Sequence, residues 1–159
     1  MKYWIGIDPG FTGAVAIMEY DTKAIDIQFW DAPVGQIGNK NVLLPTEMKR
    51  IFDSYKQTTC HIAIESVHSM KGQGVTSAFT FGKGVGLWIG VIVGLGLPYT
   101  EVLPQRWKAV MMHGMGKDKD ASRVRAMQLF PQISEQLNLK KHHGRADALL
   151  LAEYIHRQG

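Results

Sequence analysis

Two apolar runs that each end in an acidic residue constrain the fold of this chain most strongly. Residues 3–7 lead into Asp8, and residues 60–64 lead into Glu65. Short apolar runs without alternation are typical of strands that are covered on both faces. An open α/β sheet has its ligand site at the carboxyl ends of such strands. Carboxylates at the rim of a core are costly unless they are paired or hold a metal. The pattern therefore predicts an α/β fold with an acidic site at one sheet edge.

The remaining pattern supplies more strands and helices around this pair. Three strands are followed by helices and strands that alternate along the chain. This order predicts one mixed five-stranded sheet with flanking helices. Because the 159 residues contain no repeat or linker, we expect a single domain over residues 1–159. Residues 31–44 and 67–75 are expected to be loops. We expect strands at 3–8, 14–20, 24–30, 60–65 and 98–103, and helices at 45–57, 76–94, 104–111, 120–130 and 145–157.

Charge is distributed unevenly along the chain, whose formal net charge is +4. The C-terminal third has ten Lys or Arg residues against five acidic ones. This excess favours a phosphate-bearing partner, although solvated helix faces would have the same composition. The basic residues are Arg106, Lys108, Lys117, Lys119, Arg123, Arg125, Lys140, Lys141, Arg145 and Arg157.

Compartment and membrane association follow from weaker signals. The lone Cys60 excludes an intramolecular disulfide and fits a reducing compartment, so we expect a cytoplasmic protein, with an organellar matrix as the alternative. No signal peptide is visible at the start of the sequence. The apolar run 86–97 has 12 residues and four glycines, whereas a membrane span needs about 20. We interpret it as part of a buried core helix and expect no membrane partner.

A third acidic residue, Asp147, is expected in the first turn of the last helix. It shares a helix face with Leu150, Leu151 and Tyr154, so this face should pack toward the sheet. Three unpaired carboxylates in one place would repel one another, and a divalent cation would resolve that repulsion. Oxygen ligands favour Mg²⁺, with Mn²⁺ as a substitute, over zinc.

Each acidic residue also has a simpler explanation. Asp8 could shape the following Pro-Gly turn, Glu65 could be an exposed strand end, and Asp147 could be a favourable acid near a helix N-terminus. The repeated placement of acids at the rim of the core favours the metal site over three separate explanations.

In their local sequence these acidic residues resemble the motifs of RuvC-type Holliday junction resolvases, in particular phage or organellar relatives. The resemblance runs in order through nearly the whole chain. It implies an RNase H-like fold, a homodimer, a four-way DNA junction as substrate, and paired nicks. It also implies metal binding by Asp8, Glu65 and Asp147 and a catalytic role for Lys108 and Lys119 near the scissile phosphate. The matching segments are Gly6-Ile7-Asp8-Pro9-Gly10, Thr12-Gly13-Ala14, Ile64-Glu65-Ser66-Val67, Pro104-Gln105-Arg106-Trp107-Lys108, Lys119 and Ala146-Asp147-Ala148-Leu149.

The chain departs from the family pattern at one position. RuvC proteins have a fourth ligand, Asp or His, three residues before the last aspartate, and here that residue is Gly144. His143 is our candidate replacement, because it precedes the helix that carries Asp147. The alternative is that His142 and His143 belong to a basic loop that faces DNA.

The hypothesis that follows is two-metal hydrolysis of a phosphodiester. Met70 in the loop 67–75 is a candidate apolar wedge between bases, or part of a lid without base contacts. Glycines 82, 86, 90 and 94 form a helix stripe that would serve a dimer interface or, as we favour, close packing on the sheet. The candidate DNA contacts are Met70, Lys71, Arg106, Lys108, Lys117, Lys119, Arg123, Lys140 and Lys141.

Three other functions fit parts of the pattern. An actin-like ATPase or sugar kinase shares the opening strand and turn, but it needs two such domains, so we expect no nucleotide cofactor. A junction-binding protein without nuclease activity would gain nothing from clustered anions. A related nuclease that cuts flaps, forks or RNA–DNA hybrids would have the same fold and metal site, and the sequence does not separate it from a junction resolvase.

Overall fold

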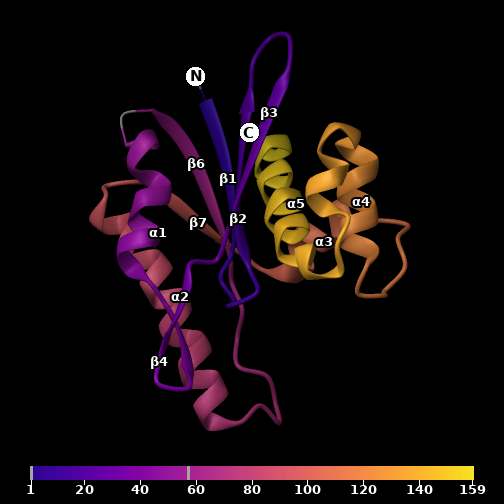
Figure 1. Cartoon of the computed structure of the whole chain (residues 1–159). Coiled ribbons are helices and arrows are strands. Elements are labelled where there is room, and N and C mark those ends of the chain that lie inside the picture. The colour runs from indigo at the N-terminus through magenta and orange to yellow at the C-terminus, as the bar shows by residue number, and fades with distance from the viewer. Residues whose placement is uncertain (1, 57) are drawn as a thin grey trace.

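A mixed five-stranded sheet runs through the computed structural model, which describes residues 2–56 and 58–159 (Figure 1). β1 pairs antiparallel with β2 and parallel with β6, and β6 pairs parallel with β7. The predicted mixed α/β sheet is therefore confirmed, and its strand order is β3-β2-β1-β6-β7. The strands are β1 (Lys2–Asp8), β2 (Ala14–Tyr20), β3 (Ile25–Asp31), β6 (Thr59–Glu65) and β7 (Tyr99–Val102).

Helices cover both faces of this sheet (Figure 1). α1 and α2 lie on one face, and α3, α4 and α5 lie on the other. Short 3₁₀ helices at Asp53–Tyr55, Pro131–Leu137 and Lys140–His142 complete these layers and were not predicted. The helices are α1 (Pro45–Phe52), α2 (Val75–Gly94), α3 (Pro104–Met111), α4 (Ala121–Leu129) and α5 (His143–Gln158).

β1 is the central strand, and its side chains enter the cores on both faces. Trp4 packs in the core under α5, whereas Ile5 and Ile7 pack in the core under α1 and α2. Gly6 allows α5 to lie directly on the strand, because a Cβ there would overlap the carbonyl oxygen of Ala148. This close approach sets the height of α5 above the carboxyl end of β1.

The predicted loop 31–44 is instead a β-hairpin, made of β4 (Val34–Ile37) and β5 (Lys40–Leu43). A two-residue turn joins the strands, and Gly38 adopts a positive φ of 59° in it. A Gly-Asn pair between two strands is a hairpin signal, which the glycines of this segment obscured. The hairpin packs against α2 through Leu43, which is buried beside Gly84.

The prediction that the apolar helix is buried in the core is wrong for most of α2. Only Gly84, Trp88 and Ile92 are buried. The expected packing of the glycine stripe on the sheet is wrong too, because a Cβ at Gly82, 86, 90 or 94 would meet nothing within 4 Å. Composition cannot tell which side of an apolar helix is covered.

α2 is long and apolar enough to cross a membrane, with 17% of its most apolar window buried. A single helix of this kind is weak evidence for a membrane span. Trp88 and Ile92 lie in the core between α2 and the sheet, as in a helix that covers a sheet face.

Candidate active site

The structure places the three predicted acids at the carboxyl end of β1. Asp8 ends β1 and Glu65 ends β6, the parallel neighbour of β1, so both carboxylates leave the sheet at the same edge. Asp147 lies one turn into α5, because this helix begins two residues earlier than expected, at His143. Its neighbour Ala148 contacts β1 at Gly6, so the third carboxylate lies above the same strand.

The electrostatics show that the three carboxylates influence one another. Burial, followed by the charges of Asp147 and Glu65, raises the pKa of Asp8 to about 7. Burial is also the main reason that the pKa values of Glu65 and Asp147 are raised. The backbone N–H of Gly10 donates to Asp8 Oδ1 at 3.3 Å and opposes the effect for Asp8. Ionising all three carboxylates together is therefore unfavourable unless a cation binds between them.

This donor set fits a hard divalent cation. Asp147 Oδ1 is buried and has no hydrogen-bond partner within the described part of the chain. The three groups do not make a closed cage, since among residues 2–56 and 58–159 no three His, Cys, Asp or Glu side chains are placed to hold a metal ion. Mg²⁺ commonly binds through one or two carboxylates, several waters and substrate phosphates, and does not require an all-protein cage.

Two side chains that were not predicted for the site position the acids. The indole Nε1 of Trp107 donates to Glu65 Oε2 at 2.7 Å, and this bond lowers the pKa of Glu65 against the effect of burial. Trp107 is fully buried in α3, so it holds the carboxylate from a rigid base. A side-chain hydrogen bond from Ser122 in α4 has the same effect on Asp147. No sequence signal pairs these residues, which are far apart in the chain.

The two predicted lysines differ in position. Lys108 is exposed on α3, and its charge lowers the pKa values of all three acids. Its ammonium lies 5.3 Å from the centre of the Trp107 ring. Lys119 is exposed in the connection between α3 and α4. The charge of Lys108 therefore acts on all three carboxylates.

The packing at the start of α5 explains why residue 144 is a glycine and not the ligand of the family pattern. A Cβ at Gly144 would overlap the carbonyl oxygen of Thr12 and lie 2.8 Å from Gly13 Cα, so no side chain fits at this position. His143 precedes Asp147 by one helical turn, and its charge lowers the pKa of Asp147. His142 is buried and accepts a hydrogen bond from the N–H of Leu139 at Nδ1 (3.3 Å), so it is not in an open loop.

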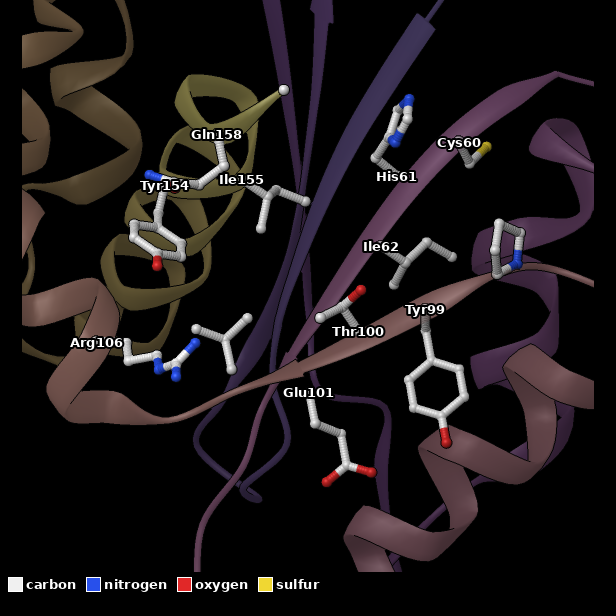
Figure 2. A pocket seen from close by; sticks show the side chains of 13 residues that line it. Cys60, His61, Ile62, Tyr99, Thr100, Glu101, Arg106, Tyr154, Ile155 and Gln158 are labelled. Atoms are coloured by element: carbon white, nitrogen blue, oxygen red, sulfur yellow. The ribbon is translucent and has the colours of Figure 1, made fainter.

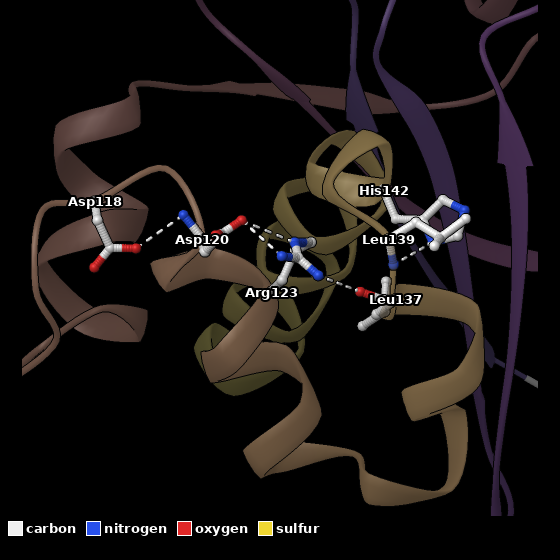
Figure 3. A network of polar contacts seen from close by, with 6 residues as sticks. All are labelled: Asp118, Asp120, Arg123, Leu137, Leu139 and His142. Carbon is white, nitrogen blue, oxygen red and sulfur yellow. Dashed lines mark hydrogen bonds and ion pairs between the residues drawn. The ribbon is translucent and has the colours of Figure 1, made fainter.

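Arg123 does not fit its predicted role as a DNA contact. It is 8% exposed, and its guanidinium donates to Asp120 Oδ1 at 2.6 Å and to the carbonyl of Leu137 at 3.0 Å (Figure 3). This arginine joins α4 to the 3₁₀ segment that follows it. The remaining candidates are exposed: Met70, Lys71, Arg106, Lys108, Lys117, Lys119, Lys140 and Lys141.

A cavity of about 430 Å³ is lined by residues of β6, β7 and α5 (Figure 2). It lies along the free edge of β7 and the end of α5, between Thr100, Tyr154 and Gln158. Arg106 is the one predicted DNA contact that lines it. None of its lining residues is Asp8, Glu65 or Asp147, so this cavity is not the candidate active site.

Sequence comparison relates about half of this chain to a known protein. No protein-family model matches the chain. Over 85 residues, or 54% of this chain, it is 39% identical to the chloroplastic Holliday junction resolvase MOC1 of Chlamydomonas reinhardtii. The match spans 10% of that protein's length.

Solved structures match over almost the entire chain. Thermus thermophilus RuvC aligns with a TM-score of 0.60 and 17% identity, covering 98% of this chain and 95% of RuvC. RuvC in complex with a Holliday junction substrate aligns with the same TM-score and coverage at 15% identity. The chain therefore has the RNase H-like fold of RuvC, as its sequence predicted, and over half its length it is similar to a chloroplast Holliday junction resolvase.

Proposed function

We propose that this protein is a divalent-metal-dependent endonuclease that resolves four-way DNA junctions by paired nicks. The observation that carries the proposal is the meeting of Asp8, Glu65 and Asp147 at one edge of a RuvC-like fold, each with a raised pKa. A DNA-binding protein without catalysis would gain nothing from buried anions that face phosphate. The names of the similar proteins, a Holliday junction resolvase and RuvC with a junction substrate, support the choice of DNA structure.

The three carboxylates would hold Mg²⁺, or Mn²⁺ in its place, with His143 as a candidate further ligand. Bound divalent ions would supply an activated water and stabilise charge on the leaving oxygen. Trp107 keeps the Glu65 carboxylate oriented through its 2.7 Å hydrogen bond. The ammonium of Lys108 would contact the scissile phosphate, and its electrostatic effect on all three acids supports this role. Lys119, exposed in the connection between α3 and α4, is a second candidate for this phosphate contact.

DNA would cross the sheet edge that carries the acids. Met70 is 75% exposed in the loop that follows Glu65, as an apolar wedge requires. Lys71 stands beside it, and Arg106, Lys117, Lys140 and Lys141 supply exposed charge for the phosphates of the junction arms. Because the relative is chloroplastic, an organellar matrix is a fitting compartment beside the cytoplasm.

Paired nicks require two active sites, and α2 offers a surface for a second copy of the chain. The stripe of Gly82, 86, 90 and 94 is open, and Phe79 and Val93 beside it are 73% and 57% exposed. Small residues allow close helix approach, and exposed apolar side chains supply the contact area. We propose a homodimer of single-domain protomers, in which α2 meets its counterpart.

The deciding experiment compares a labelled four-way junction, a flap, a fork, a linear duplex and an RNA–DNA hybrid in Mg²⁺, Mn²⁺ and EDTA. We expect symmetric, metal-dependent nicks in the junction, abolished by Asp8→Asn and retained by the matched surface change Asp118→Asn. Cleavage of the flap, fork or hybrid in place of the junction would refute the proposed substrate and would still support the metal site. Tight junction binding without cleavage in either metal would refute the nuclease.

A further inference from the structure

The sheet ends at β7, and no other strand covers the outer edge of β7. It is the last strand in the order β3-β2-β1-β6-β7, and among the described residues only β6 pairs with it. The N–H of Ser66 donates to the Val102 carbonyl at 2.9 Å, so the backbone groups of Val102 face β6. Because backbone groups alternate in direction along a strand, those of Tyr99 and Glu101 face outward. This edge therefore offers unpaired donors and acceptors to an added strand.

The cavity of about 430 Å³ lies along this same edge (Figure 2). Val102 lies in the core under α5, and Tyr99 packs against the core under α2. Since side chains alternate along a strand, Thr100 points to the α5 side, where it lines the cavity together with Tyr154 of α5. Glu101 points to the opposite face of the sheet. A strand added to β7 would direct every second side chain into the cavity.

The charges around this cavity favour a carboxylate. Arg106, at the start of α3, lines the cavity and makes no ion pair within the described part of the chain. His61 lines it too and stacks on Trp4 of the core under α5. Of the described residues in the lining only Glu101 is acidic, and its side chain points to the other face. An acidic side chain that enters from an added strand would therefore meet an unpaired guanidinium.

Apolar side chains border the cavity on the side of α3. Leu103 joins β7 to α3 and is 38% exposed, and Val110 is 44% exposed. Val110 lies one helical turn after Arg106, so the two share a side of α3. An extended partner that leaves β7 over α3 would therefore place apolar residues next to its carboxylate.

We propose that the free edge of β7 and this cavity bind an extended peptide segment of another protein, which adds a strand to the sheet and places an acidic side chain beside Arg106. β7 has four residues and offers few hydrogen bonds, so the cavity supplies the remaining affinity and the sequence preference. DNA could pair its phosphates with Arg106, but it has no backbone amides to pair with the strand edge. The site is separate from the proposed nuclease chemistry and does not depend on it.

The test selects short random peptides displayed on phage against the full chain, and measures the enriched peptides by fluorescence anisotropy. Glu101→Pro removes one outward N–H at an edge position, where proline is tolerated. Glu101→Gln is the matched control, because it removes the same charge and keeps the N–H. Arg106→Gln removes the cation, and a peptide with an amide in place of its acid completes a double-mutant cycle.

We expect the enriched peptides to share one acidic residue among β-branched and apolar residues. Glu101→Pro should weaken binding about tenfold, and Glu101→Gln should not weaken it. Arg106→Gln should weaken the acidic peptide about tenfold and the amide peptide hardly at all. Methylation of alternate peptide nitrogens should abolish binding in one phase and spare it in the other. This last result does not depend on how well the proline variant folds.

Three results would overturn the peptide site. The first is that no peptide is enriched, or that the enriched peptides tolerate both Glu101→Pro and Arg106→Gln and methylation in either phase. The second is a loss of junction affinity in Arg106→Gln without any selected peptide, which would assign this arginine to DNA. The third is self-association of the wild type that Glu101→Pro abolishes, which would assign the edge to a second copy of the chain. None of these results requires cleavage, so each is distinguishable from failure of the nuclease proposal.

Discussion

Helices α5 and α2 lie on opposite faces of the same sheet, and the more apolar of the two is the more exposed. α5 buries eight of its 16 residues, and its backbone rests on β1 at Gly6. α2 buries three of its 20 residues, and its glycine stripe faces open space. Close packing therefore fixes the helix that positions Asp147, whereas most of the apolar surface of α2 is exposed. The apolar content of a helix alone does not tell whether its surface is buried or exposed.

The largest effect should come from breaking the contact under α5. Gly6→Val should lower the free energy of unfolding by more than about 3 kcal/mol, because a Cβ there overlaps Ala148 O and lies 2.7 Å from Ala152 N, both backbone atoms. Urea unfolding followed by circular dichroism measures it. The contrast on the other face is Gly90→Ala, which should change stability by no more than about 1 kcal/mol, since its Cβ meets nothing within 4 Å. Equal effects at the two glycines would refute the comparison.

Asp8→Asn tests the buried negative charge at the carboxyl end of β1. We expect nicking to fall by more than about 10³-fold, and the metal-free variant to be more stable than the wild type at pH 8 by about 2–4 kcal/mol. The pKa of Asp8 is raised to about 7, so the folded wild type binds an extra proton between about pH 4 and 7. Metal-free stability should therefore fall as pH rises through that window.

Thermal unfolding in EDTA across pH 4 to 8 measures this loss of stability. In the Asp8→Asn variant the loss should be much smaller, and adding Mg²⁺ should restore wild-type stability at high pH. A wild-type protein that is as stable at pH 8 as at pH 5 without metal would contradict the strained acidic site.

Phe79→Asp tests the exposed face of α2. The substitution should weaken dimerisation by about 2 kcal/mol or more, because it places a charge in an apolar interface, and should leave the protomer folded since Phe79 is 73% exposed. Sedimentation equilibrium reports the assembly. Val124→Asp on α4, where the side chain is 41% exposed, is the control and should dimerise normally. If the wild-type protein is a monomer at micromolar concentration, the exposed face of α2 is not a dimer interface.

The smallest effect is expected at the ion pair that joins β3 to the start of α5. Arg145 donates to both carboxylate oxygens of Asp31 at 2.7 and 2.8 Å, and these bonds lower the Asp31 pKa. Asp31→Asn should cost less than about 1 kcal/mol, because the Asp31 side chain is 63% exposed. The contribution is present above about pH 4 and is lost as pH falls, because protonation removes the pair. Urea titrations measure the effect, with Asp26→Asn on the same strand as the matched control.

The local sequence predicted much of the fold and three of the site residues. β2 and α3 have the predicted bounds, and the strands that carry Asp8 and Glu65 end where the apolar runs end. These features depend on residues that are close in sequence: an apolar run, a proline at a helix start, an acid at a strand end. Asp147 was predictable for the same reason, since the apolar residues one turn away give the direction of its helix face.

Interactions between distant segments were not predictable in this way. Arg123 has the charge of a DNA contact but is buried against Leu137, and Trp107 has the apolarity of a core residue but also holds Glu65. The hairpin 34–43 was obscured by its glycines, although its two-residue turn was a usable signal. In each case the partner lies on another element, and the residue type alone fits two environments.

The α/β sheet, the three acids at its edge and the charge of the C-terminal third could therefore be predicted from local sequence patterns. The exposed face of α2, the burial of Arg123 against Leu137 and the hydrogen bond from Trp107 to Glu65 depend on tertiary packing. The physical reason is that periodicity and residue type report what a segment can bury. What it does bury depends on the backbones that approach it, as Gly6 under α5 and the open glycines of α2 show.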